Sequence, residues 1–163
     1  MKAIRLSIKH APNEKLPYHV GWGHTVVKFA NRRKAASYAE EIGKAMTLIL
    51  FDINTMHAEL LVHLRRSWTM DAPFVRNMQK SVGEIELNMD FATNNRHISY
   101  PYKNLNRALE LIDSHLLIIE DFYKKRNHNA LASELRSTRN RIVTIRSELA
   151  MYDRRIETFL FSK

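Results

Sequence analysis

Residues 35 to 63 read AASYAEEIGKAMTLILFDINTMHAELLVH, with a residue of one seam at every third or fourth position. This alternation of three and four predicts one long helix whose seam packs against other helices. The middle of the stretch, residues 45 to 51, is apolar on nearly all sides, so the rest of the chain is expected to enclose it. The seam consists of Ala35, Ala39, Ile42, Met46, Ile49, Ile53, Met56, Leu60 and His63.

The same spacing recurs in residues 75–92, 105–123 and 131–159, and short connections separate these stretches. Helices joined by short connections are usually antiparallel neighbours. We therefore predict a mainly α fold, a four-helix antiparallel bundle of heptad-patterned helices. Long coiled-coil hairpins that complete a bundle with another copy are the alternative. Asp71, followed by Pro73, is expected to cap the start of the second helix.

The composition agrees with a single helical domain without covalent or metal supports. The chain has 163 residues, only 4 Gly and 4 Pro, and no Cys. All four Gly precede residue 84 and the last Pro is Pro101, so the C-terminal third contains no helix breaker. The lack of Cys excludes a disulfide scaffold, a thiolate zinc site and a cysteine nucleophile.

The first 30 residues follow a different pattern. Residues 3–9 alternate apolar and polar side chains, and residues 25–30 are rich in branched and aromatic ones. Both stretches predict strands, separated by a loop over residues 10–24, and Asn31 is expected to cap the long helix. We therefore divide the chain into a basic N-terminal arm or two-stranded β-ribbon, residues 1–30, and a helical bundle, residues 31–163.

Positive charge is concentrated in this N-terminal region. The chain has a net charge of +9, and residues 1–34 hold eight Lys and Arg against the single acidic residue Glu14, a charge of +7. Cations interleaved with rings suit single-stranded nucleic acid, whereas the alternative is that Tyr18 and Trp22 only anchor the loop on the bundle. The expected partner or nucleic-acid contacts are Lys9, His10, Lys15, Tyr18, His19, Trp22, His24, Arg32, Arg33 and Lys34.

No motif for catalysis, metal binding or cofactor binding occurs in the sequence. It lacks a Glu-x-x-His pair, a His-Glu-x-x-His zinc motif, a phosphate-binding loop and a nucleophile elbow. Three histidines of the N-terminal region could hold a metal, but their spacing fits no fixed backbone shape. Glu59 and His63 are four residues apart on the expected helix. They are interpreted as a structural pair at the end of the seam, and a buried acid and base couple is the alternative. We predict that the protein is not an enzyme, with no catalytic residue, no cofactor and no metal.

The expected helix lengths point to assembly with other subunits. The first and last helices are longer than the other two, so their ends should extend beyond them, and the apolar residues expected there are Tyr152, Ile156, Phe159 and Phe161. We predict a non-enzymatic structural protein that packs with copies of itself or with neighbouring subunits, as in a virion or nucleoprotein assembly. The alternative is an accessory protein that binds nucleic acid through the basic arm. Without a signal-peptide pattern or an apolar run of membrane length, we expect a cytoplasmic or virion-like location and no membrane partner.

Overall fold

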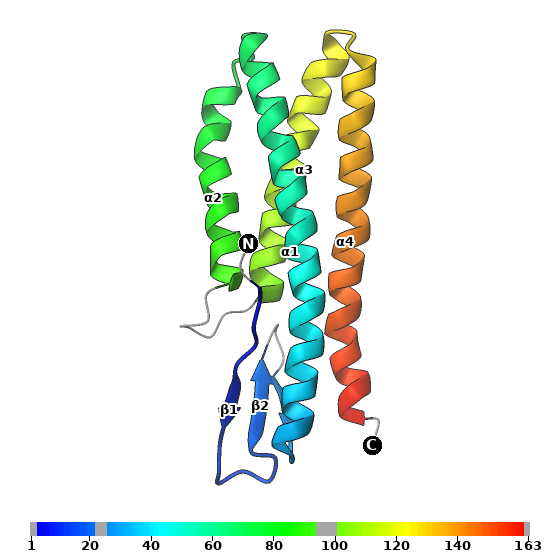
Figure 1. Cartoon of the computed structure of the whole chain (residues 1–163). Coiled ribbons are helices and arrows are strands. Elements are labelled where there is room, and N and C mark those ends of the chain that lie inside the picture. The colour runs from blue at the N-terminus through cyan, green and yellow to red at the C-terminus, as the bar shows by residue number, and fades with distance from the viewer. Residues whose placement is uncertain (1–2, 22–25, 94–100, 162–163) are drawn as a thin grey trace.

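The computed structural model of the chain describes residues 3–21, 26–93 and 101–161, with side chains described up to residue 152. These residues are mainly helical, and a small antiparallel sheet precedes the helices (Figure 1). The strands are β1 (Ile8–His10), β2 (Tyr18–Gly21) and β3 (Val26–Phe29). The helices are α1 (Arg32–Thr69), α2 (Val75–Thr93), α3 (Pro101–Lys125) and α4 (Asn129–Phe161).

The two long helices predicted from the sequence are confirmed. α1 has 38 residues and α4 has 33, against 19 for α2 and 25 for α3. The predicted cap of α1 is also confirmed, because the Asn31 side chain accepts a hydrogen bond from the Arg33 amide at 2.7 Å. This bond satisfies one of the amides that have no partner in the first turn of a helix.

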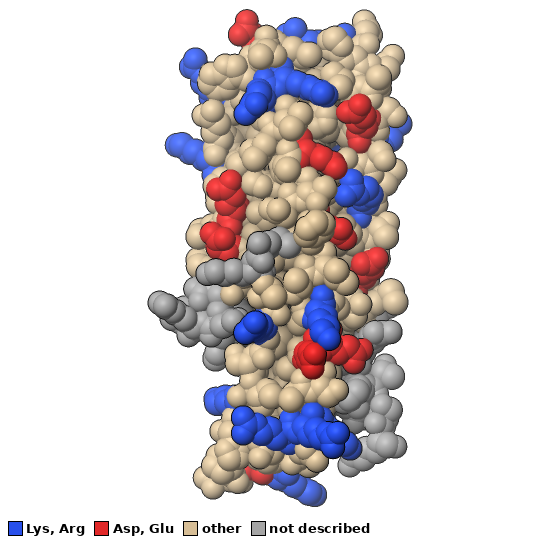
Figure 2. Space-filling model, viewed as in Figure 1, with Lys and Arg blue, Asp and Glu red and all other residues tan. Residues whose placement is uncertain are grey.

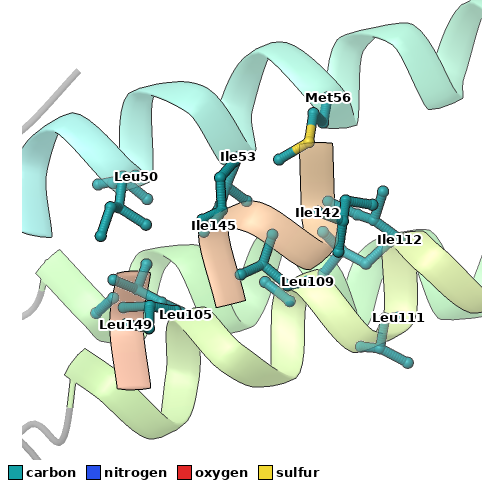
Figure 3. Close-up of a cluster of buried hydrophobic side chains, with 14 of the residues drawn as sticks. Leu50, Ile53, Met56, Leu105, Leu109, Leu111, Ile112, Ile142, Ile145 and Leu149 are labelled. Carbon is teal, nitrogen blue, oxygen red and sulfur yellow. The ribbon is translucent and has the colours of Figure 1, made fainter. Parts of the chain in front are cut away.

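The helices lie side by side (Figure 1), and their predicted seams form the core. α3 packs against each of the other three helices, and all nine residues of the α1 seam are buried. Figure 3 shows the centre of this core, where side chains of α1, α3 and α4 meet. The buried residues labelled there include Leu50, Ile53, Met56, Leu105, Leu109, Ile112, Ile142, Ile145 and Leu149.

The N-terminal region forms three strands and not the predicted two. The strands are antiparallel in the order β1-β2-β3, and β2 lies within the stretch expected to be a loop. The two-stranded ribbon was therefore a wrong prediction. Pro17 directly precedes β2 and Gly21 is its last residue, and these two turn-forming residues hide the short strand pattern of Tyr18, His19 and Val20. A loop over residues 11–17 joins β1 to β2, and the Ala11 amide donates to the Pro17 carbonyl at 2.7 Å across its ends.

The predicted first strand is also shorter than expected, because residues 3–7 leave the sheet and lie against α1. Ile4 is buried, and its amide donates to the Thr47 hydroxyl at 2.9 Å. Ile8 begins the paired segment opposite Val20. Packing against α1 thus replaces strand pairing for the N-terminal half of the predicted strand.

The sheet covers the part of α1 that extends beyond α2 and α3 (Figure 1). All three strands contact α1, and β3 also contacts α4. Ile4, Val20, Val27 and Phe29 belong to the same buried cluster as the helix seams. The N-terminal region therefore packs on its own helices, and the division at residue 30 stays a prediction about folding units.

The predicted cap of α2 is wrong. Asp71 has φ 54, in the left-handed region, and ends α1, while α2 begins at Val75. The Ala72 amide donates to the Ser67 carbonyl at 3.0 Å. This bond is typical of an α-helix that ends with a residue in the left-handed region. Asp71 thus ends α1 and does not begin α2. The sequence allowed both interpretations, because Asp is common at helix starts and also tolerates the left-handed region at helix ends.

Candidate interaction surfaces

Three of the predicted contact residues form interactions within the sheet. His10 of β1 stacks on Tyr18 of β2, with ring centroids 5.0 Å apart. His19 is buried, and its Nε2 lies 2.9 Å from both the Leu16 carbonyl oxygen and a Glu14 carboxylate oxygen. These contacts hold the turn between β1 and β2. His19 is therefore not presented to a partner.

The predicted cations are exposed at this end of the molecule. Figure 2 shows Lys and Arg side chains gathered at the end that carries the sheet. Glu14 bonds to Lys28 at 3.1 Å, and this hydrogen bond is the main reason why the pKa of Glu14 is lowered. Within the described part of the chain, none of the other predicted cations forms an ion pair; these are Lys9, Lys15, Arg32, Arg33 and Lys34. Trp22 and His24 lie outside the described residues.

A groove of about 770 Å³ is lined by the N-terminal segment, residues 3–8, and by α1. One wall is formed by residues 3–6 and Ile8, and the other by α1 between Ala36 and Leu48. Most of these residues are apolar, and Arg5, Glu40 and Lys44 are the charged side chains that line it. The groove is lined mainly by apolar side chains, and its charged rim belongs to the basic end.

A second seam of three-and-four spacing lies on the side of α1 that faces solvent. Its members are Leu48, Phe51, Thr55, Ala58 and Val62, all of them exposed and uncharged. We call these five residues the outward seam. The three large ones are 70%, 59% and 51% exposed. Residues 45–51 were expected to be enclosed by the rest of the chain, and this prediction is wrong for Leu48 and Phe51, which are exposed. The three-and-four spacing of the outward seam was present in the sequence, but only the inward seam was followed.

The outward seam also explains the unusual hydropathy of α1. Among the described residues, α1 is the helix that is long and apolar enough, by length and composition alone, to cross a membrane. Its most apolar window of 18 residues has a mean hydropathy of 1.3, and 39% of the window is buried inside the structure. A core helix of a soluble protein passes the same test. α1 combines an apolar core side with an apolar outer side.

The predicted assembly surface at the end of α4 is described only in part. Tyr152 is partly buried and packs against the core cluster. Ile156, Phe159 and Phe161 lie in the helix, but their side chains are outside the described residues. For this reason the outward seam, and not the end of α4, is the apolar surface considered for assembly below.

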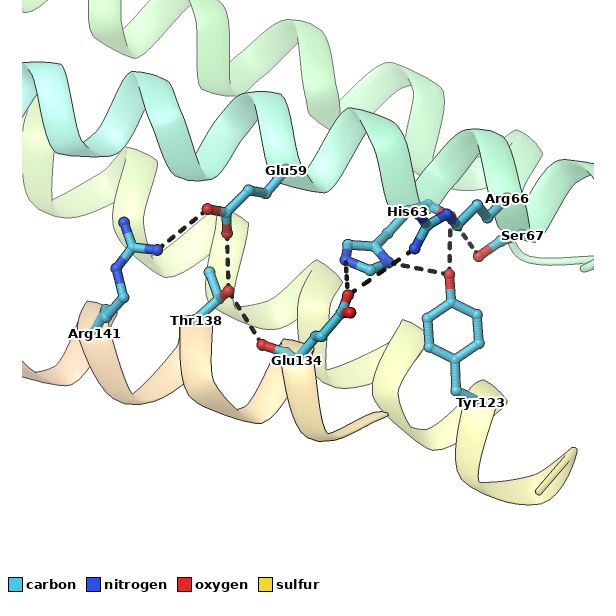
Figure 4. A network of polar contacts seen from close by, with 8 residues as sticks. All are labelled: Glu59, His63, Arg66, Ser67, Tyr123, Glu134, Thr138 and Arg141. Atoms are coloured by element: carbon cyan, nitrogen blue, oxygen red, sulfur yellow. Dashed lines mark hydrogen bonds and ion pairs between the residues drawn. The ribbon is translucent and has the colours of Figure 1, made fainter. Parts of the chain in front are cut away.

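A network of polar side chains joins α1, α3 and α4 (Figure 4), and it does not form the acid and base pair considered for Glu59 and His63. Glu59 accepts a hydrogen bond from Thr138 at 2.9 Å and one from Arg141 at 3.2 Å. His63 Nδ1 lies 3.2 Å from the Tyr123 hydroxyl. These contacts connect helices. They support the structural interpretation of both residues.

Burial, and then the nearby Arg66, lower the pKa of His63, while Glu134 and Glu59 raise it. For Tyr123, burial has the opposite effect on the pKa and raises it. Both shifts favour the neutral form of a side chain that lies between helices. Such neutral groups hydrogen-bond well at a helix interface.

The described residues contain no group of three or more His, Asp or Glu that could hold a metal ion. Of the histidines considered for such a site, His10 and His19 serve the sheet and His24 is outside the described residues. The buried nitrogens without a hydrogen-bond partner, in the part of the chain that is described, belong to His57 and His115. Neither has the convergent neighbours of a catalytic site.

Comparison of the chain with protein-family models, with curated proteins and with solved structures finds no match.

Proposed function

We propose that this protein is a non-enzymatic assembly protein whose outward seam packs against a helix of another subunit. The observation that carries the proposal is the second heptad seam on α1, in which five exposed positions repeat the spacing of a coiled coil. A helix with one seam in its own core and another in solvent is suited to join two helical layers.

A second part of the proposal concerns how the four helices pack. We propose that α1 to α4 form an antiparallel four-helix bundle, supported by the helix contacts and by the short connections from α1 to α2 and from α3 to α4. An added helix, from a second copy of this chain, would lie along α1. Contiguous exposed apolar surface is costly in a monomer and is typical of protein interfaces.

The test is the mass of the purified protein in solution at tens of micromolar, measured by sedimentation at two salt concentrations. We expect a mass above that of the monomer that changes little with salt, because apolar association is not screened. The double variant Phe51→Glu/Val62→Glu should be monomeric, because each substitution places a charge in the outward seam.

The control is Val143→Glu/Met151→Glu, which adds the same charge at two exposed apolar positions of α4. It should leave the mass unchanged. A wild-type protein that stays monomeric throughout, or an equal effect of the two double variants, would contradict the proposal.

A second function, nucleic-acid binding by the basic end, is favoured by five exposed cations that lack an ion-pair partner among the described residues. Phosphate contacts would make binding of a generic single-stranded oligonucleotide weaken steeply with salt. Charge reversal at Lys9 and Lys15 should then reduce the slope by about one for each phosphate that is no longer neutralised. Salt-independent or undetectable binding would exclude this function.

A further inference from the structure

The groove beside the N-terminal segment lies next to an open edge of the sheet. β1 is an outer strand in the order β1-β2-β3, and Ile8 of this strand also lines the groove. An outer strand presents backbone groups that can pair with another extended chain. The edge and the groove together therefore offer backbone pairing on one side and apolar contacts on the other.

Contacts with α1 hold the N-terminal segment in place, so the site is preformed in the free protein. The Ile4 amide bonds to Thr47, and a Cβ at Gly43 would lie only 2.9 Å from the Ile4 carbonyl oxygen. Along residues 4 to 9 the buried or partly buried Ile4, Leu6 and Ile8 alternate with exposed residues. This alternation is the period of an extended chain with one side on the protein.

The charges around the site select the chemistry of the partner. Arg5 and Lys9 are exposed on the segment and on β1, and neither has an ion pair within the described residues. On α1, Glu40 is paired with Lys44 at 3.0 Å, so that wall is neutral. The unpaired charge at the site is thus positive, and a complementary chain is acidic.

The same charges disfavour a second copy at this edge. If β1 paired with β1 of another copy, Lys9 of the two chains would lie close together, and like charges across paired strands are destabilising. The net charge of +9 on each chain adds to this repulsion.

We propose that the groove and the edge of β1 bind an extended acidic segment of a neighbouring subunit, which adds to the sheet as a further strand. Its apolar side chains enter the groove between the N-terminal segment and α1, and its carboxylates lie beside Arg5 and Lys9. The proposal rests on the assembly function above and names one partner for it.

The probe is a labelled, end-capped peptide of about ten residues in which Glu alternates with Val and Ile, long enough to span residues 3–10. Binding to the full chain is followed by fluorescence anisotropy. We expect saturable binding that weakens about tenfold or more in Arg5→Glu/Lys9→Glu. It should change less than about twofold in the matched reversal Arg76→Glu/Lys80→Glu, at two exposed positions of α2.

A second pair of variants tests the groove without changing charge. Ala36→Trp places a large ring in the groove, and Ala130→Trp places the same ring at an exposed position of α4. Only the first should abolish binding. The peptide methylated on alternate backbone nitrogens should also fail to bind, because it cannot add to a strand edge.

Equal effects of the two Trp variants, or unchanged binding of the methylated peptide, would overturn the proposal. Binding of a single-stranded oligonucleotide without binding of the acidic peptide would overturn it in favour of nucleic acid. The assembly function is tested by separate variants, because Phe51 and Val62 do not line the groove. Loss of self-association in their Glu variants with peptide binding retained would show that the two surfaces act independently.

Discussion

The Ile4 amide donates a hydrogen bond to Oγ1 of Thr47, 2.9 Å away, and the same hydroxyl donates to the Gly43 carbonyl oxygen at 2.7 Å. One threonine thus joins the N-terminal segment to a turn of α1. The close approach is allowed by Gly43, where a Cβ would lie 2.9 Å from the Ile4 carbonyl oxygen. Gly43 is therefore a site of packing, although glycine weakens an isolated helix.

Gly43→Ala should lower the free energy of unfolding by about 1 kcal/mol, because overpacking against a backbone carbonyl outweighs the gain of about 1 kcal/mol in helix propensity. Urea unfolding followed by circular dichroism measures the change. Gly83→Ala in α2 is the control, since nothing lies within 4 Å of its added Cβ. It should stabilise the protein by up to about 1 kcal/mol, and stabilisation by both would show that the segment does not lie on α1.

The buried seam should carry most of the stability. Ile145 is buried in α4, whereas Val143, two residues earlier, is 63% exposed. Ile145→Ala should cost about 2 to 5 kcal/mol, and Ile49→Ala in α1 a similar amount, because each leaves a cavity in the core. Val143→Ala should change stability by less than about 0.5 kcal/mol. Equal losses at Ile145 and Val143 in urea unfolding would mean that the register of α4 is wrong.

Glu120 is the most deeply buried acidic side chain among the described residues, with 3% exposure. It accepts hydrogen bonds from Arg139 at 2.9 Å and from Arg136 at 3.1 Å, which tie α4 to α3. Burial raises the pKa of Glu120, but the bonds from the two arginines outweigh it, so the pKa is lowered. Its stabilising effect is therefore complete above its ordinary value of 4.5 and is lost as the pH falls through the lower folded value.

Glu120→Gln should cost about 1 to 3 kcal/mol at neutral pH, because it removes the charge that two guanidinium groups share. Thermal unfolding at pH 7 measures the loss. Glu40→Gln breaks an exposed pair with Lys44 and should cost less than about 0.5 kcal/mol. A loss at Glu120 no larger than that at Glu40 would show that the buried contacts contribute little.

Three buried histidines make the protein sensitive to mild acid. Burial is the main cause that lowers the pKa of His57, His63 and His115 below 6.5. The unfolded chain therefore takes up protons first as the pH falls below 6.5. Stability decreases from there down to each folded pKa, by up to about 1.4 kcal/mol per pH unit for each histidine.

Nearby groups oppose the effect of burial on the pKa of these histidines, but they are weaker. Glu86 faces His57 and Glu84 faces His115, and both raise the pKa of their neighbour. The nearby backbone of Leu111 also raises the pKa of His115. His115→Leu should reduce the loss of stability between pH 7 and pH 5, measured by urea unfolding at several pH values. His128→Gln, at an exposed position, should leave that loss unchanged; an equal effect of both would contradict the assignment.

Deleting residues 1–24 should preserve the helical circular dichroism signal, because every helix seam lies after residue 34. The structure adds that the midpoint of unfolding should fall, since Ile4 and Val20 are buried in the common core. A truncated chain that loses its helical signal would show that the division at residue 30 does not separate two folding units.

The helices, their lengths and the Asn31 cap could be predicted because each depends on local spacing. A heptad pattern such as that of Ile49, Ile53 and Met56 reports the period of a helix wherever its partners lie. The concentration of charge before residue 35 is likewise a property of the sequence alone. The function, the assembly state and the nucleic-acid alternative stay predictions.

Tertiary structure decided what these local patterns could not. The short β2 exists because two neighbouring strands satisfy its backbone groups, and residues 3–7 leave the sheet because Thr47 and the space beside Gly43 accept Ile4. Both seams of α1 have the same spacing. Only the positions of the other helices bury Ile53 and leave Phe51 in solvent, because burial depends on neighbours that are distant in the sequence.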